Sequence, residues 1–361
     1  MFVIASGLGQ QEEGDLCIDV KTGGSGICTI IGDCAEVLKS AIVNGTMPQV
    51  CSHLGTLQIV CCPSTSPVRT SCLPLSAPYI KVQKTGRKSW DHCIDLLETI
   101  FPCEKSEERW VRENKCPGIP SEGISDDGVV PPGEFPHLVS LGMGDLPDIR
   151  WRCTGSFISD QWVLTSAGCL MLFGPLTYVA PGGDSPEPNK ISLNQIHSII
   201  ETVRHPEYNV RSKLNDIALV KINRVAGHAA CLHTDIPLPD DGFVYTGKNN
   251  EGILQKMTMV KISHAECSRT VNLMALRLTN DTIFCSRNVK PLRILRNKCQ
   301  FGMSAGSPVQ VYNGNRVACT HLLVGIISRS FGASCGEDGH FTAIFTRVAP
   351  YVPWIEGIVW P

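Results

Sequence analysis

A serine hydroxyl is a poor nucleophile unless a base within hydrogen-bond reach accepts its proton. Such chemistry would need a serine, a base and a carboxylate, and the chain has a serine and an aspartate in distinctive local sequences. Ser304 follows Gly302-Met303 near the C-terminal end, and Asp216 stands in the run Asn-Asp-Ile-Ala-Leu-Val. A carboxylate of this kind can orient and stabilise a base but does not replace it. The residue that would supply the base therefore decides whether the chain can do this chemistry.

The stretch from Cys153 to Cys169 is the most informative part of the chain. Two apolar runs, Phe157-Ile158 and Trp162-Val163-Leu164, flank a polar Ser-Asp-Gln turn. This pattern predicts a β-hairpin, and the terminal cysteines suggest that a disulfide closes it.

The same stretch resembles the Cys-Gly-Gly-Ser-Leu-Ile-Ser … Val-Leu-Thr-Ala-Ala-His-Cys segment of chymotrypsin-like serine proteases. In that family the histidine before the second cysteine is the general base, and here its place holds Gly168. In a well-studied protease, losing the base lowers turnover roughly a millionfold, because the triad acts as a unit. The resemblance therefore implies a protease fold without a working triad, unless a base arrives from elsewhere in the chain.

The other two triad positions differ in how well they are kept. Asp216 matches the family's Asn-Asp-Ile-Ala-Leu motif, and without the histidine we expect a buried carboxylate satisfied by nearby backbone donors. From Cys299 to Pro308 the chain has two residues more than the family's Cys-Gln-Gly-Asp-Ser-Gly-Gly-Pro. Matching Gly-x-Ser makes Ser304 the nucleophile, whereas counting back from Pro308 puts Ala305 there. Either alignment damages the turn that should supply oxyanion-binding N–H groups.

The resemblance also assigns the substrate cleft. Asn297, two residues before Cys299, stands where tryptic enzymes have an aspartate at the base of the specificity pocket, and Ser330-Phe331-Gly332 resembles the Ser-Trp-Gly strand that lines the cleft. The implied disulfides of this domain are Cys153–Cys169, Cys267–Cys285 and Cys299–Cys335.

The activation switch of the family is altered as well. Ile124-Ser125-Asp126-Asp127 precedes Pro-Gly-Glu-Phe-Pro-His, as Ile-Ile-Gly-Gly does in the relatives. Trypsin-like activation cleaves after Arg or Lys, but the residue before Ile124 is Gly123. We expect no cleavage there, and expect any regulatory nick at exposed basic linker positions such as Arg87 or Lys88.

Composition places the chain outside the cytoplasm. The 361 residues leave room for two domains, and eighteen cysteines with no dominant metal-binding pattern indicate disulfides and an oxidising compartment. The short apolar start is interpreted as a signal remnant and N-terminal segment over residues 1–16, and the protein is expected to be secreted. Asn44 and Asn280 fit the N-glycosylation pattern. The net charge of −2 gives no reason to expect nucleic acid or membrane as a partner, and no metal or other cofactor is expected.

Residues 17–62 form a small module with six cysteines in a Gly-rich background. A unit of this size needs disulfides because it cannot bury enough apolar surface. The spacing, ending in Cys61-Cys62-Pro63, resembles the clip domain of arthropod serine proteases, although six cysteines allow fifteen connectivities. The pairs that this resemblance implies are Cys17–Cys61, Cys28–Cys51 and Cys34–Cys62.

Residues 63–123 are predicted to be a linker. Apolar residues from Trp90 to Ile100 recur at helical spacing, which predicts a short amphipathic helix that docks against the next domain. Cys231 and Cys319 of the next domain are left to pair with two linker cysteines or with each other. The linker contributes Cys72, Cys93, Cys103 and Cys116.

The predicted fold is mostly β: a disulfide-rich clip domain, then a chymotrypsin-like double β-barrel over 124–361 that ends in a helix. The resemblance implies a secreted, non-catalytic protease homologue. It would act as cofactor or regulator in an extracellular cascade of innate immunity, of the melanisation or prophenoloxidase type, with haemolymph proteases or pro-enzymes as partners. An active endopeptidase with a rearranged site and a protein that recognises microbial surfaces remain the alternatives.

Overall fold

The structure is a computed structural model of the chain. It describes residues 12–19, 25–63, 72, 75, 79–106, 109–116, 128–131, 133–172, 174–182, 193–223, 228–234, 238, 242–248, 254–271, 281–291, 294–295, 298–299, 304–313, 316–331, 340 and 342–361.

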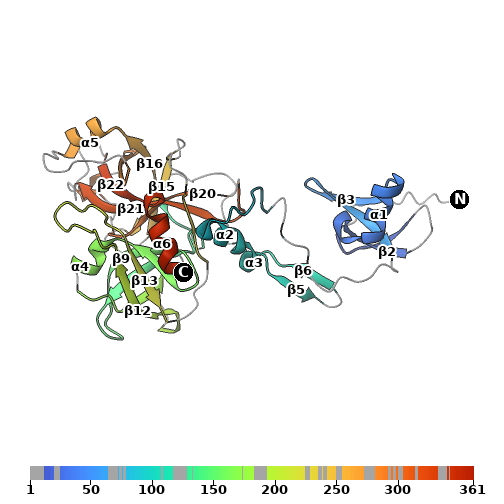
Figure 1. The fold of residues 1–361 in the computed structure, drawn as a ribbon, viewed down its shortest axis with the longest axis horizontal. Helices are drawn as coiled ribbons and strands as arrows, with labels where there is room; N and C mark the ends of the chain where they lie inside the picture. The colour runs from blue at the N-terminus through green and yellow to red at the C-terminus, as the bar shows by residue number, and fades with distance from the viewer. Residues whose placement is uncertain are drawn as a thin grey trace. The chain divides into compact units, whose positions relative to one another are not determined.

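The described chain divides into two compact units, one of residues 1–78 with 102–113 and one of residues 79–101 with 114–361 (Figure 1). None of the described helices, the longest of which has ten residues, is long and apolar enough to cross a bilayer. The helices are η1 (Ile31–Asp33), α1 (Ala35–Asn44), α2 (Lys88–Asp95), α3 (Leu97–Ile100), α4 (Ala167–Leu172), η3 (Leu193–Gln195), α5 (His264–Val271), η4 (Ala349–Tyr351) and α6 (Val352–Val359).

The first unit contains a four-stranded antiparallel sheet in the order β1-β2-β4-β3 beside α1, and a separate hairpin of β5 and β6. Half-cystines and a few aliphatic side chains form its core, as expected for a module too small for an apolar core of its own. The disulfides Cys17–Cys61, Cys28–Cys51 and Cys34–Cys62 are those that the clip-domain resemblance implies. The strands are β1 (Leu16–Ile18), β2 (Ser25–Ile30), β3 (Val50–Leu54), β4 (Leu57–Pro63), β5 (Cys103–Ser106) and β6 (Arg109–Arg112).

Asn44, one of the two predicted glycosylation acceptors, is exposed at the last position of α1. Gly45 follows with φ 64°, a left-handed conformation that ends the helix at little steric cost for glycine. Asn280 lies outside the described residues.

The predicted linker helix is present as α2 and α3. Trp90, Cys93, Leu97 and Ile100 are buried, because helical spacing brings them to one side. The helix α2 packs against β14 (Cys231–Leu232) and α6 of the second unit. This part of the linker is therefore a docked element of the protease-like unit, as the amphipathic pattern predicted.

The two predicted cleavage positions lie at the start of α2, where Lys88 is exposed and Arg87 is partly exposed, and cleavage there stays a prediction. Arg87 precedes α2 and is half-buried, with its Nε 3.4 Å from Glu356 Oε1 on α6. The backbone N–H and the hydroxyl of Ser89 both donate to the same oxygen, at 3.0 Å and 2.6 Å. Lys88 Nζ donates to the carbonyl of Trp360. The side chains at the start of α2 are therefore held against α6 and the residue that follows it.

Cys231 and Cys319 pair with linker cysteines, which decides between the two alternatives that the sequence left open. The bonds are Cys93–Cys231 and Cys116–Cys319, and Cys72 pairs with Cys103 within the first unit. The predicted bonds Cys153–Cys169 and Cys267–Cys285 are present. Cys335 lies outside the described residues, so the predicted bond Cys299–Cys335 does too.

These bonds predict the behaviour of a nicked chain. A cut between residues 104 and 115 leaves Cys93 on one fragment and Cys231 on the other, so that disulfide keeps the fragments joined. We expect one band on a non-reducing gel and two after reduction. The Cys93→Ser/Cys231→Ser variant should give two bands in both cases, because no other described disulfide crosses that interval. Separation of the unmodified nicked chain without reductant would contradict this pairing.

The second unit holds two six-stranded antiparallel barrels. The first closes in the order β10-β13-β12-β11-β8-β9, and β20, β15, β16, β17, β22 and β21 form the second (Figure 1). The hairpin predicted between Cys153 and Cys169 is β9 and β10, and Ser159 Oγ accepts from the N–H of Trp162 in its turn. The predicted terminal helix is α6. Closure removes exposed strand edges and makes a rigid support for loops.

The bounds of these strands complete the fold. They are β7 (Gly128–Val129), β8 (Leu138–Met143), β9 (Arg150–Phe157), β10 (Trp162–Thr165), β11 (Tyr178–Pro181), β12 (His197–Arg204), β13 (Ala218–Ile222), β15 (Phe243–Lys248), β16 (Leu254–Ile262), β17 (Ile283–Asn288), β18 (Ile294–Leu295), β19 (Lys298–Cys299), β20 (Pro308–Tyr312), β21 (His321–Phe331) and β22 (Thr342–Arg347).

Candidate functional site

The retained carboxylate and the glycine in place of the base are in direct contact. The backbone N–H of Gly168, on α4, donates to Asp216 Oδ1 at 2.7 Å, and Ser328 Oγ donates to Oδ2 at 2.7 Å. Asp216 is only 1% exposed. Both carboxylate oxygens therefore have a donor, one from the backbone and one from a side chain, so the buried group is satisfied without an imidazole.

Burial dominates the electrostatics of this carboxylate. It raises the pKa of Asp216 above its ordinary value, because a charged group is less well solvated inside the protein. The hydrogen bonds from Ser328 and Gly168 and the charges of Lys213 and Arg329 act in the opposite direction. In an intact triad a histidine would help to stabilise the charged form of this aspartate. Here two hydrogen bonds and two nearby cations do so.

Lys213 occupies the space beside Gly168. A Cβ added at Gly168 would lie 3.2 Å from Lys213 Nζ and 3.5 Å from both Asp216 Oδ1 and the hydroxyl of Tyr208. Lys213 Nζ donates to the Tyr208 hydroxyl at 2.8 Å. Burial, followed by the Asp216 charge, raises the pKa of Tyr208 to about 12. A side chain as large as histidine at position 168 would require Lys213 to move.

His205 is close to this region in the sequence, but its ring packs elsewhere. Its ring lies 5.1 Å from that of Tyr351 and 5.0 Å from that of Trp354, centroid to centroid, both in edge contacts. Its Nδ1 accepts a 3.3 Å hydrogen bond from the N–H of Glu207. Burial lowers the pKa of His205. These contacts commit the ring to packing against residues of η4 and α6.

The turn that should carry the nucleophile presents an alanine to the core. Ala305 packs against the apolar cluster that contains the Cys153–Cys169 disulfide, and its carbonyl accepts from the N–H of Thr154 at 2.9 Å. The carbonyl of Ser304 accepts from Ser307 within the turn, at 3.1 Å. Ala305 therefore packs beside the Cys153–Cys169 disulfide, and whether Ser304 or Ala305 takes the place of the nucleophile stays a prediction.

The backbone of this turn requires a glycine at position 306. It has φ +84°, and an added Cβ would lie 2.1 Å from the carbonyl oxygen of Thr154 and 2.2 Å from Thr165 Oγ1. Only glycine fits such an approach in a left-handed conformation. The turn thus sits directly on β9 and β10.

The sequence missed the serine that contacts Asp216. Ser328 donates to it, two residues before the predicted cleft strand Ser330-Phe331-Gly332. A bulge between Ile327 and Arg329 shifts the register of β21 against β22 and is not visible in the sequence. The side chains of Ser330 and Phe331 lie outside the described residues, as do Gly332, Asn297 and the activation segment 124–127.

The trypsin family model matches residues 126–355. The serine protease Hayan of Drosophila melanogaster is 27% identical over 66% of this chain, which spans 39% of Hayan. The serine protease snk of Drosophila melanogaster is 24% identical, covering 96% of this chain and 79% of snk. Phenoloxidase-activating factor 1 of Holotrichia diomphalia is 26% identical, covering 65% of this chain and 69% of that protein.

Among solved structures, the Drosophila Grass clip serine protease of the Toll pathway matches with a TM-score of 0.50 and 19% identity, over 95% of this chain and 97% of Grass. This likeness extends the agreement in fold to the N-terminal unit. The chain belongs to the trypsin family, in the arthropod group whose members join a clip domain to a chymotrypsin-like protease domain.

Proposed function

We propose that this protein is a secreted, non-catalytic serine protease homologue that acts as a cofactor or regulator in an extracellular protease cascade of innate immunity. One observation carries the proposal: Asp216 is hydrogen-bonded to the backbone of Gly168, with Lys213 Nζ in the space where a base would stand. A lysine ammonium only donates hydrogen bonds and cannot accept the proton of a serine. In the turn that should carry the nucleophile, Ala305 packs against the apolar cluster of the Cys153–Cys169 disulfide and has no hydroxyl.

The cascade role rests on the relatives. Phenoloxidase-activating factor 1 is named for the activation of phenoloxidase, and Grass is described as a clip serine protease of the Toll pathway. A rigid fold that no longer aligns a triad still presents its loops for recognition. Disulfides in both units suit an oxidising extracellular space. The expected partners are proteases or pro-enzymes of the cascade.

A fluorophosphonate probe tests the absence of catalysis. We expect the purified protein, whole or nicked in the linker, to show no peptidase or esterase turnover and no labelling, because Gly168 stands where the family has its general base. Trypsin at the same concentration is the positive control. Stoichiometric labelling at Ser304 would contradict the proposal and support the active endopeptidase.

The Ser304→Ala variant tests the cofactor role. In a reconstituted cascade it should behave as the unmodified protein, whereas omitting the protein should lower activation of the downstream pro-enzyme. If Ser304→Ala abolished the effect while the variant stayed folded, the protein would act through catalysis. If omission had no effect, the cofactor role would have to be given up.

A further inference from the structure

Four basic residues belong to the region around Gly168 and Asp216. We call Arg204, Arg211, Lys213 and Arg329 the basic rim. Lys213 donates to the hydroxyl of Tyr208, and Arg329 Nη2 donates to the carbonyl of Arg211 at 2.7 Å. The positive charges of Arg204 and Arg329 both act on the Tyr208 phenol, so these side chains lie around one point.

The buried Asp216 acts on Lys213 and Arg329, the two less exposed residues of the basic rim. Asp216 is the nearest carboxylate, but it is buried and already accepts from Gly168 and Ser328. Glu207, next to Tyr208 in the chain, acts on His205 and Tyr351 instead. None of the ion pairs found in the described part of the chain involves a rim residue. The exposed Arg204 and Arg211 are therefore the rim cations that a partner can reach.

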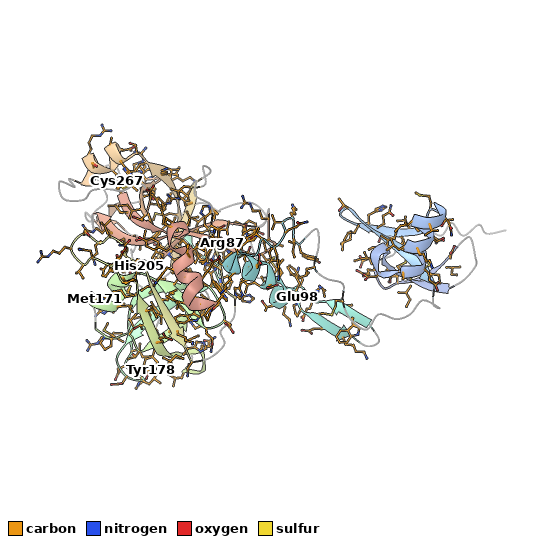
Figure 2. All side chains as sticks on the ribbon, in the orientation of Figure 1. Arg87, Glu98, Met171, Tyr178, His205 and Cys267 are labelled. Carbon is orange, nitrogen blue, oxygen red and sulfur yellow. A yellow bond between two sulfur atoms is a disulfide. The ribbon has the colours of Figure 1, made fainter. Side chains whose placement is uncertain are left out.

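Exposed apolar side chains lie beside these charges. Met171, on α4, is 46% exposed, and its Sδ accepts from Arg204 Nη1 at 2.8 Å. Val210 is 47% exposed and adjoins Arg211 in the chain. Figure 2 shows Met171 and His205, the neighbour of Arg204, on the protease-like unit. A surface that combines arginines with apolar side chains is typical of protein-binding sites, where Arg and Met are enriched.

We propose that the basic rim binds an acidic polypeptide segment with interspersed apolar residues, supplied by a partner protein. This inference rests on the proposed function, because it takes a protease-like unit that works without catalysis as a binding surface. Carboxylates of the partner would pair with Arg204, Arg211 and Arg329, and the partner's apolar residues would cover Met171 and Val210. The apolar neighbours favour a polypeptide over a sulfated polysaccharide, whose recognition would need charge alone.

Fluorescence anisotropy on the full-length protein tests the proposal. The probe is a short fluorescein-labelled peptide of repeating Glu-Glu-Leu units, and a Gln-Gln-Leu peptide of equal length is the neutral comparison. We expect the acidic peptide to bind more tightly and to weaken as salt is raised. The Arg204→Glu/Arg211→Glu variant changes two exposed positions, so its fold should persist, and its affinity should fall by about tenfold or more.

Lys261→Glu is the control, because Lys261 is an exposed cation on β16 of the second barrel and is not a rim residue. It should leave binding unchanged. Equal affinity for both peptides, or an equal loss in the control, would overturn the proposal. Binding of a heparin fragment through Arg204 and Arg211 without binding of the acidic peptide would overturn it in favour of a polysaccharide ligand.

The binding assay contains no cascade, so the two proposals fail separately. If the acidic peptide does not bind while fluorophosphonate labelling stays absent, the basic-rim proposal is wrong and the non-catalytic assignment stands. If Ser304 is labelled while the peptide binds through the two arginines, the proposed function is wrong and the binding surface stands.

Discussion

Replacing Lys256 by methionine is expected to destabilise the protein by about 3–5 kcal/mol. Lys256 on β16 has a side chain 0% exposed and forms an ion pair with Glu134, 7% exposed, in the segment that leads into the first barrel. The second carboxylate oxygen of Glu134 has no hydrogen-bond partner among the described residues. Without the lysine, a buried charge would lose its compensation. Urea denaturation followed by tryptophan fluorescence measures the change.

Two further variants separate burial from charge. Lys84→Met removes the cation of the exposed Lys84–Asp95 pair and should cost less than about 1 kcal/mol. The double variant Lys256→Met/Glu134→Leu should recover most of the stability, because it removes both buried charges. A loss at Lys256 no larger than that at Lys84 would show that the buried pair does not hold this segment in place.

The protein is expected to lose stability as the pH falls from about 6.5 towards 4. His137 is buried, its Nε2 lies 2.6 Å from Gln310 Oε1, and burial lowers its pKa to about 4. His321, with its ring centroid 5.2 Å from that of His137, has a pKa well below its ordinary value, because of burial and then the charge of His137. His228 is the other titratable group that acts on His137.

The sign follows from proton linkage. The unfolded chain takes up these protons near pH 6.5 and the folded protein does so only near pH 4 for His137, so folding stability is full above pH 6.5 and declines below it. The difference corresponds to about 3 kcal/mol from His137 alone. Urea midpoints measured across this pH range should fall accordingly.

Two variants test whether the buried histidines cause the loss of stability at low pH. His321→Phe removes one buried titration, so its urea midpoint should fall less steeply with pH. His53→Phe, at an exposed position of the first unit, should leave the pH dependence unchanged. Parallel curves for His321→Phe and the unmodified protein would mean that other groups cause the decline.

The sequence alone predicted the architecture, and it showed that Gly168 stands where the family has its histidine. The clip-domain pairs were implied by the resemblance to clip domains, since six cysteines alone allow fifteen connectivities, and the structure has the same three bonds. The hairpin of β9 and β10 followed from two apolar runs around a polar turn. Gly168 and Asp216 could be identified because each stands in a local motif, and the structure places them in direct hydrogen-bond contact.

Tertiary structure decided what surrounds those two residues. Lys213 reaches the space beside Gly168 from a left-handed backbone conformation, with φ 57°, in a loop far away in the sequence, and no local pattern encodes such a contact. A bulge between Ile327 and Arg329 of β21 changes which side chains face inward, and Ser328 beside it donates to Asp216. The partners of Cys231 and Cys319 likewise follow from where the linker docks, since a disulfide forms only between cysteines that folding brings within bonding distance.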